Sequence, residues 1–118
     1  MAAVCIEDYD KGLLTEALCQ QVIQAAVRMG KAVLVDPARL RDYRKYRGAT
    51  ILTPNRQEFQ MAAACPDNGL ETIRARSSDL VRQCDLQGVL VTLDREGVIL
   101  ALRDQAPLHL PTRPRAVY

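Results

Sequence analysis

The chain of 118 residues lacks tryptophan and has a single histidine and a single phenylalanine. Its four cysteines form no C-x-x-C pair, which excludes the common cysteine–histidine zinc sites. No apolar run approaches the length of a membrane span, so we expect no membrane partner. The net charge of +2 is too small to indicate nucleic acid. We therefore expect a cytoplasmic protein with buried, reduced thiols.

Several catalytic signatures are also absent. The chain has no Ser-His-Asp or Cys-His set, no G-x-x-x-x-G-K-S/T loop and no G-x-G-x-x-G turn. These absences argue against a hydrolase, a P-loop enzyme and a dinucleotide-binding fold. The length fits one domain, and 48% hydrophobic and 25% charged residues are ordinary for a globular protein.

Short apolar runs alternate with helical spacing of apolar residues along the chain. This pattern predicts strands at 2–6, 32–35, 50–53, 88–93 and 98–102, and helices at 15–29, 55–64 and 70–84. It indicates an α/β domain with Rossmann-like layering, a mostly parallel sheet and helices on both faces. We expect 32–35 to be fully buried, 98–102 to return as a hairpin strand, and 107–118 to run extended over the surface.

Polar residues follow most of the predicted strands. They are Asp8, Asp36, Asn55 with Glu58, and Thr92. Because the carboxyl ends of parallel strands meet at one edge of a sheet, we expect these side chains to lie along the same edge. Ligands bind at that edge in open α/β sheets, so it is the predicted site.

Asn55-Arg56-Gln57-Glu58 opens a predicted helix directly after a strand and Pro54. Asn-x-x-Glu is a helix-capping pattern, in which each side chain bonds to the other residue's backbone N–H. A helix start also attracts phosphate, and a carboxylate beside phosphate requires a divalent cation between them. The motif therefore also indicates Mg²⁺ at Glu58, directly or through water. The two interpretations are compatible, and both stay open.

A second polar turn, 8–12, places Asp8 near Lys11. Asp8 can hydrogen-bond sugar hydroxyls and Lys11 can pair with a phosphate, but a solvated turn with a local ion pair is an equal alternative. A similar choice, between phosphate contacts and a solvated basic loop, applies to four arginines: Arg39, Arg41, Arg44 and Arg47.

Five segments, in order along the chain, resemble the ribokinase-like (PfkB) carbohydrate kinases, and among them the heptose 7-phosphate kinases. The segments are 7–12, 34–37, 46–59, 90–93 and 108–112. The resemblance implies ATP-dependent phosphorylation of a sugar, with O1 of D-glycero-D-manno-heptose 7-phosphate as the leading acceptor in ADP-heptose synthesis for the lipopolysaccharide core. Another sugar of the family is the runner-up.

The same resemblance assigns roles to individual residues. It implies that Asn55, Arg56, Gln57 and Glu58 bind the nucleotide, with Mg²⁺ at Glu58. It places Asp8 and Lys11 at the phosphorylated sugar. Three positions depart from the family pattern: Glu7 replaces a usual serine, Ala38 a usual lysine, and Asp94 a small residue.

The resemblance also implies that 1–118 is the middle portion of a kinase domain. We expect the sugar-binding half and lid to precede it, and a Gly-Ala-Gly-Asp region with the aspartate base to follow Tyr118. No catalytic base is therefore expected within the chain, and the chain alone should not catalyse phosphoryl transfer. A homodimeric parent protein is compatible with this reading.

A receiver-like signalling module is the alternative from a different class. It shares the size, the acidic pair Glu7-Asp8 and the strand-end Thr92. A receiver places a lysine after the next strand, whereas Arg103 and Asp104 follow 98–102 here. The predicted hairpin return at 98–102 also argues against this fold.

Overall fold

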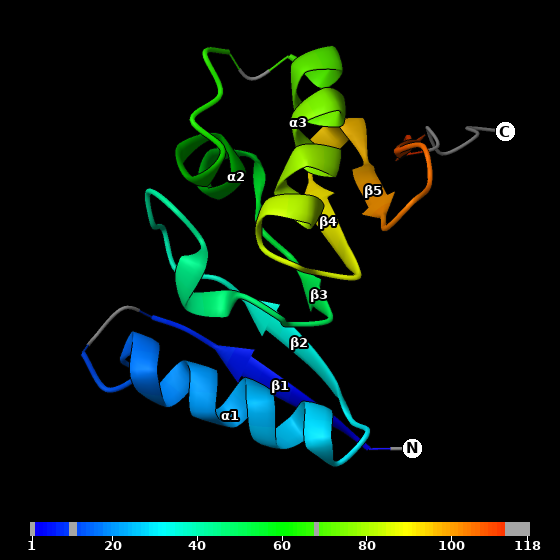
Figure 1. Ribbon diagram of the computed structural model, residues 1–118. Coiled ribbons are helices and arrows are strands. Elements are labelled where there is room, and N and C mark those ends of the chain that lie inside the picture. The colour runs from blue at the N-terminus through cyan, green and yellow to red at the C-terminus, as the bar shows by residue number, and fades with distance from the viewer. Residues whose placement is uncertain (1, 10–11, 68, 113–118) are drawn as a thin grey trace, which may run out of the picture.

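A single six-stranded sheet forms the centre of the protein in a computed structural model that describes residues 2–9, 12–67 and 69–112 (Figure 1). The strands are Ala3–Glu7 (β1), Ala32–Asp36 (β2), Ile51–Leu52 (β3), Gly88–Thr92 (β4), Val98–Leu102 (β5) and Leu108–Leu110 (β6). The α-helices are Glu16–Arg28 (α1), Arg56–Ala62 (α2) and Leu70–Gln83 (α3). Two 3₁₀ turns, Arg44–Tyr46 (η1) and Asp94–Glu96 (η2), complete the described elements.

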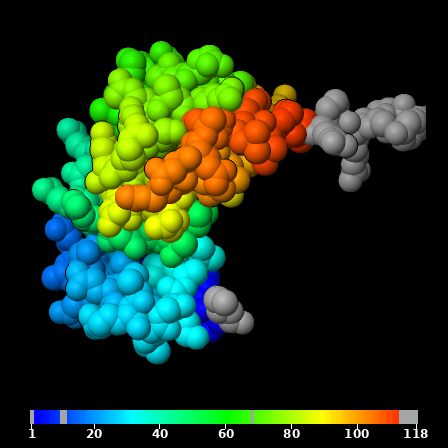
Figure 2. Space-filling view, turned by 45° about the vertical axis from the view of Figure 1, so that its right-hand side comes forward, coloured from blue at the N-terminus to red at the C-terminus, as the bar shows by residue number. Residues whose placement is uncertain are grey.

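The strands follow one another in space in the order of the sequence. β1 to β4 pair in parallel, and β4, β5 and β6 form an antiparallel meander. The predicted mostly parallel α/β sheet and the hairpin return at 98–102 are confirmed. That antiparallel return removes the crossover strand which a receiver fold requires. Part of the predicted extended tail is a strand, β6, and the segment from β5 to β6 lies at the surface (Figure 2).

All three described helices contribute to one core on one face of the sheet. That core contains Val33 and Val35 of β2, Val89 and Val91 of β4, and the helix residue Ile23. The prediction of helices on both faces is wrong for the described residues. Because the strand order never reverses, successive right-handed crossovers leave their helices on the same side.

The opposite face of the sheet changes a second prediction. Val33 and Val35 are buried, but Leu34 between them is 38% exposed, so the expected full burial of 32–35 is wrong. Likewise, Cys5 is exposed, whereas Cys19, Cys65 and Cys84 are buried and free. Burial raises the pKa of these three thiols, in agreement with inert core cysteines.

Local signals fix the first helix as predicted. The Thr15 hydroxyl oxygen accepts a hydrogen bond from the Leu18 N–H at 3.1 Å, which caps α1. Gly30 follows the helix with a φ of +69°, a conformation in which a side chain is strained. Within the described ranges, no helix is long and apolar enough to span a bilayer.

Candidate functional site

The carboxyl ends of the parallel strands bring the predicted polar residues to one edge of the sheet. Asp8 follows β1, and its backbone N–H donates to the Asp36 carbonyl at the end of β2 at 3.1 Å. Asn55 bridges to Thr92 at the end of β4, beside a 3.0 Å bond from the Thr92 N–H to the Pro54 carbonyl. Lys11 lies outside the described residues.

A depression of about 670 Å³ lies at this edge between the start of α2 and η2. Asn55, Arg56 and Gln57 line one side, and residues 93–96 line the other. Three of the four predicted nucleotide-binding residues therefore border one hollow, and its volume is within the range typical of small-molecule sites.

A second depression, of about 310 Å³, lies between the ends of β1 and β2 and the α2 start. Glu58 lines this hollow together with Asp8, Asp36 and Arg39. The structure thus places Glu58 beside the predicted sugar-side residue Asp8, whereas its three motif neighbours line the larger depression.

The capping interpretation of the Asn-x-x-Glu motif is confirmed. The Glu58 N–H donates to Asn55 Oδ1 at 2.8 Å, and the Asn55 N–H donates to Glu58 Oε1 at 2.9 Å. This box engages one of the two oxygens of the Glu58 carboxylate. A role of the carboxylate toward a hydrated cation is therefore compatible with capping.

The available side-chain oxygens indicate how the site could bind Mg²⁺. Among the described residues, no cluster of three or more His, Cys, Asp or Glu side chains is arranged to hold a metal ion. Mg²⁺ in nucleotide sites takes one or two carboxylates and completes its shell with phosphate oxygens and water. The carboxylates of Asp36 and Glu58, which line one depression, fit that mode rather than an all-protein cage.

Asp8 is held in a buried ion pair that the sequence did not reveal. Its side chain is 2% exposed, and Oδ2 lies 2.7 Å from Lys45 Nζ and accepts from the Tyr46 hydroxyl at 2.7 Å. The Tyr46 oxygen in turn accepts from the Ala38 N–H at 2.8 Å. A buried aspartate indicates a cationic partner, but the pattern does not tell which of the chain's lysines and arginines supplies it.

Two tyrosines, Tyr43 and Tyr46, lie beneath this edge with their ring planes tilted by 54° to one another. Their ring centroids are 5.5 Å apart, and both rings are buried. Burial raises the pKa of Tyr46, with its hydrogen bond to Asp8 as the next cause. Burial also raises the pKa of Tyr43, followed by the negative charge of Glu58. The Tyr43 hydroxyl has no hydrogen-bond partner among the described residues.

The motif residues Arg56 and Gln57 make contacts across the edge. Arg56 forms an ion pair with Glu96 of η2. Gln57 Oε1 accepts from an Arg39 guanidinium nitrogen at 3.0 Å, which ties the loop after β2 to α2.

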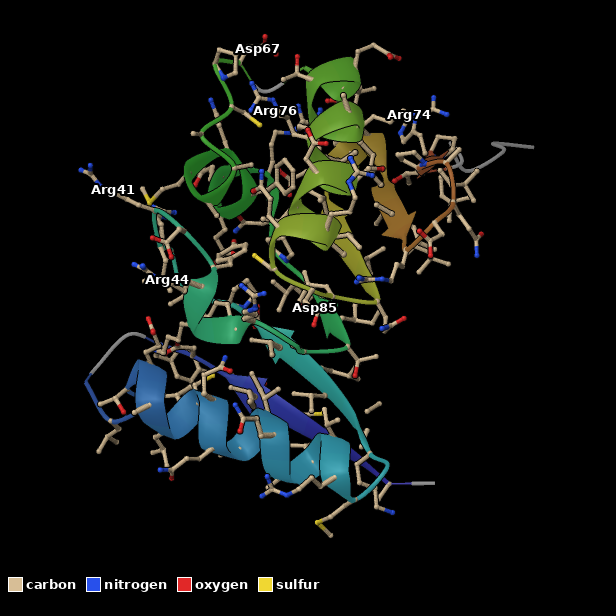
Figure 3. All side chains as sticks on the ribbon, viewed as in Figure 1. Arg41, Arg44, Asp67, Arg74, Arg76 and Asp85 are labelled. Carbon is tan, nitrogen blue, oxygen red and sulfur yellow. The ribbon has the colours of Figure 1, made fainter. Side chains whose placement is uncertain are left out.

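Two of the other loop arginines behave differently from Arg39. Arg41 and Arg44 extend from the outer side of the loop, and Arg44 forms long, exposed pairs with Glu16 and Asp42 (Figure 3). For these two arginines, the solvated-loop interpretation agrees with the structure. Arg39 is the member of the group that lines the smaller depression.

Comparison with known proteins identifies relatives over the full length of this chain. The family model described as pfkB family carbohydrate kinase matches residues 4–118. The bifunctional protein HldE of Syntrophotalea carbinolica is 41% identical over 115 residues, which are 98% of this chain and 23% of that protein. HldE of Halorhodospira halophila is 42% identical over 118 residues, 99% of this chain and 24% of that protein. The chain thus spans about a quarter of these relatives.

Solved structures share the fold. Phosphofructokinase-2 from Escherichia coli in complex with potassium aligns with a TM-score of 0.80 at 16% identity, over 98% of this chain and 38% of that one. Ribokinase of Arabidopsis thaliana complexed with ribose and ATP aligns with a TM-score of 0.66 at 24% identity, over 87% and 34%. At these identities, the likeness establishes the ribokinase-like fold alone.

Proposed function

The chain belongs to the pfkB family of carbohydrate kinases, and we propose that it is part of an ATP-dependent sugar kinase. The observation that carries this proposal is the position of Asn55 to Glu58. They stand at the carboxyl edge of the sheet, where the first three border a depression of about 670 Å³ and Glu58 borders a second of about 310 Å³. Ligands of open α/β sheets bind at this edge.

We place the ATP phosphates in the larger depression. Asn55, Arg56 and Gln57 line it and offer amide and guanidinium donors. Arg56 already faces the carboxylate of Glu96, so phosphate binding exchanges one anionic partner for another. Glu58 would hold Mg²⁺ through a water molecule, and the ion would neutralise phosphate charge during transfer.

We place the phosphorylated sugar at the smaller depression. Asp8 lines it as a fixed hydrogen-bond acceptor, and Lys11 belongs to the same turn in the sequence. Arg39 lines the same hollow and would supply a cation beside Ala38, the position at which the sequence resemblance implies a lysine. The heptose 7-phosphate implied by the sequence resemblance is the leading substrate, phosphorylated at O1, and another sugar of the family is the alternative.

We further propose that the chain is a middle portion of a cytoplasmic kinase and is inactive by itself. Phosphoryl transfer depends on a base, an anion-stabilising loop and substrate contacts that act together. The sequence resemblance implies that the base belongs to a region after Tyr118. A homodimeric parent protein remains part of the proposal.

The test places this chain in the kinase domain of the Syntrophotalea carbinolica HldE, in exchange for the segment that it matches. We expect the chimera to release ADP with D-glycero-D-manno-heptose 7-phosphate, and more slowly with ribose or fructose 6-phosphate. Absence of any sugar-dependent ADP release from a folded chimera contradicts the kinase proposal. Sugar-dependent ADP release by the isolated 118-residue chain contradicts its proposed inactivity.

Glu58→Gln separates the metal role from capping in the same chimera. Glutamine retains the capping box but not the charge, so the melting temperature should stay nearly unchanged. We expect kcat/KM for Mg·ATP to fall at least tenfold. Asn55→Ala is the matched variant and should lower the free energy of unfolding by about 1 kcal/mol through loss of the cap. Unchanged Mg·ATP kinetics in Glu58→Gln would leave Glu58 as a cap alone.

A further inference from the structure

Two residues of η1 contact Asp8 at the carboxyl edge of the sheet. Lys45 Nζ and the Tyr46 hydroxyl both lie 2.7 Å from the same oxygen of the Asp8 carboxylate, Oδ2. Asp8 lines the smaller depression, whereas Lys45 and Tyr46 are not among the described residues that line it. The two η1 residues therefore hold the carboxylate without bordering the hollow in which we place the sugar.

Hydrogen bonds hold η1 itself against α1 and the loop after β2. Gln20 of α1 donates through Nε2 to the Lys45 carbonyl at 2.9 Å and to the Arg47 carbonyl at 3.0 Å. On the other side, the hydroxyl oxygen of the buried Tyr46 accepts from the Ala38 N–H at 2.8 Å. A group is held precisely when the residues around it are themselves fixed by packing and hydrogen bonds. The η1 turn meets that condition for Asp8.

The charge of Lys45 also matters for an anionic substrate. The charged residues that line the smaller depression are three carboxylates and one guanidinium: Asp8, Asp36, Glu58 and Arg39. Carboxylates in excess repel a phosphorylated sugar. The Lys45 side chain is 13% exposed and that of Asp8 is 2% exposed, so their attraction is weakly screened and the ammonium offsets the negative charge of Asp8. Asp8 can then accept hydrogen bonds from sugar hydroxyls with less repulsion of the sugar's phosphate.

We propose that Lys45, together with Tyr46, is a positioning residue for the sugar-binding carboxylate of Asp8, an inference that rests on the proposed function. Lys45 orients the carboxylate and offsets its charge but touches neither the sugar nor the nucleotide. Loss of the ammonium therefore weakens sugar binding and spares Mg·ATP, whose phosphates we place in the larger depression. A purely structural ion pair would change stability without distinguishing between the two substrates.

Steady-state kinetics of the HldE chimera separate these two roles. Lys45→Met should raise KM for the heptose 7-phosphate about tenfold and change KM for Mg·ATP by less than about twofold. Lys45→Arg keeps the charge and should restore most of the sugar affinity. Ile73→Ala is the matched control, because Ile73 is buried in α3, which packs against β4 and β5, and its truncation destabilises the fold without touching Asp8. In the folded enzyme, this control should change either KM by less than about twofold.

An unchanged sugar KM in Lys45→Met overturns the proposal, and so does an equal rise in both KM values. A rise in the sugar KM of Ile73→Ala that matches the rise in Lys45→Met also overturns it, because lost stability alone would then explain the effect. If Lys45→Met yields no folded chimera, Tyr46→Phe decides in its place. That variant removes one of the two contacts with Asp8 Oδ2 and should raise the sugar KM about threefold. An unchanged sugar KM in Tyr46→Phe then overturns the proposal.

Hydrogen exchange distinguishes failure of this proposal from failure of the proposed function. In the same chimera, Lys45→Met should speed exchange of the Asp8 and Ala38 backbone amides about tenfold, because both amides lie in hydrogen bonds around the carboxylate. Ile73→Ala should not speed these two amides selectively. Equal exchange in the two variants contradicts the positioning of Asp8 by Lys45. Selectively faster exchange in Lys45→Met, in a chimera that releases no ADP with any sugar, supports the positioning and contradicts only the proposed function.

Discussion

Asp8 and Glu58 line the same depression, yet the protein holds the two carboxylates in opposite ways. Asp8 is buried, and its partners Lys45 and Tyr46 are distant in sequence. Glu58 accepts a hydrogen bond from the backbone N–H of Asn55, three residues away in the solvent-exposed first turn of α2. The first arrangement fixes two strand ends and a loop to one another, and the second fixes one helical turn. We therefore expect large effects from variants around Asp8 and small ones around Glu58.

Lys45→Met tests the larger side of this contrast. The variant removes the Lys45 ammonium from the buried Asp8 carboxylate, so we expect the free energy of unfolding to fall by about 3 kcal/mol in urea titrations. The Lys45 side chain is 13% exposed, so little water can reach the Asp8 carboxylate to solvate its charge. Lys45→Arg should restore most of the loss. The double variant Asp8→Asn, Lys45→Met should be more stable than Lys45→Met alone, and the opposite order would contradict a buried ion pair.

The contrast also explains what the sequence could predict. The Asn55–Glu58 box was readable because its two residues are three positions apart and follow a proline that ends a strand. The strands and helices were readable for the same reason, since their patterns are local. The Lys45–Asp8 pair was not readable because 37 positions separate its members and several other cations stand nearby in the sequence.

Local sequence patterns could not predict on which face of the sheet the helices lie. The alternation of strands and helices predicted a parallel sheet, but the placement of helices on one or both faces depends on strand order. In the observed order no reversal occurs, so the described helices share one face. The alternating exposure of 32–35 follows from that order and not from the four apolar residues themselves.

Tyr46→Phe should have an intermediate effect. The hydroxyl joins Asp8 to the Ala38 N–H, so its loss leaves the buried N–H without that acceptor and should cost about 2 kcal/mol. Burial, and then the bond to Asp8, raise the pKa of Tyr46 above 10.0. Its contribution to stability is therefore complete below pH 10 and is lost as the pH rises further.

Thermal melts between pH 8 and 11 check this prediction. The wild-type melting temperature should fall toward pH 11, and Tyr46→Phe should show a shallower alkaline fall from a lower starting value. Tyr43→Phe is the matched control, because that hydroxyl has no hydrogen-bond partner among the described residues. It should cost less than Tyr46→Phe at pH 8. An equal loss in both variants would show that ring packing, and not the hydroxyl network, determines the effect.

Arg56→Gln should have the smallest effect on folding, although it lies in the proposed nucleotide site. Arg56 is 19% exposed and its partner Glu96 is 47% exposed, so solvent reaches one side of the ion pair, which should contribute about 1 kcal/mol or less to the free energy of unfolding. Arg82→Gln, which breaks an exposed pair with Asp79 on α3, should cost a similar amount. In the HldE chimera, however, Arg56→Gln should raise KM for Mg·ATP several-fold, whereas Arg82→Gln should not. Equal kinetics in the two variants would show that Arg56, like Arg82, has no role in nucleotide binding. That result would contradict the proposed position of the ATP phosphates in the larger depression.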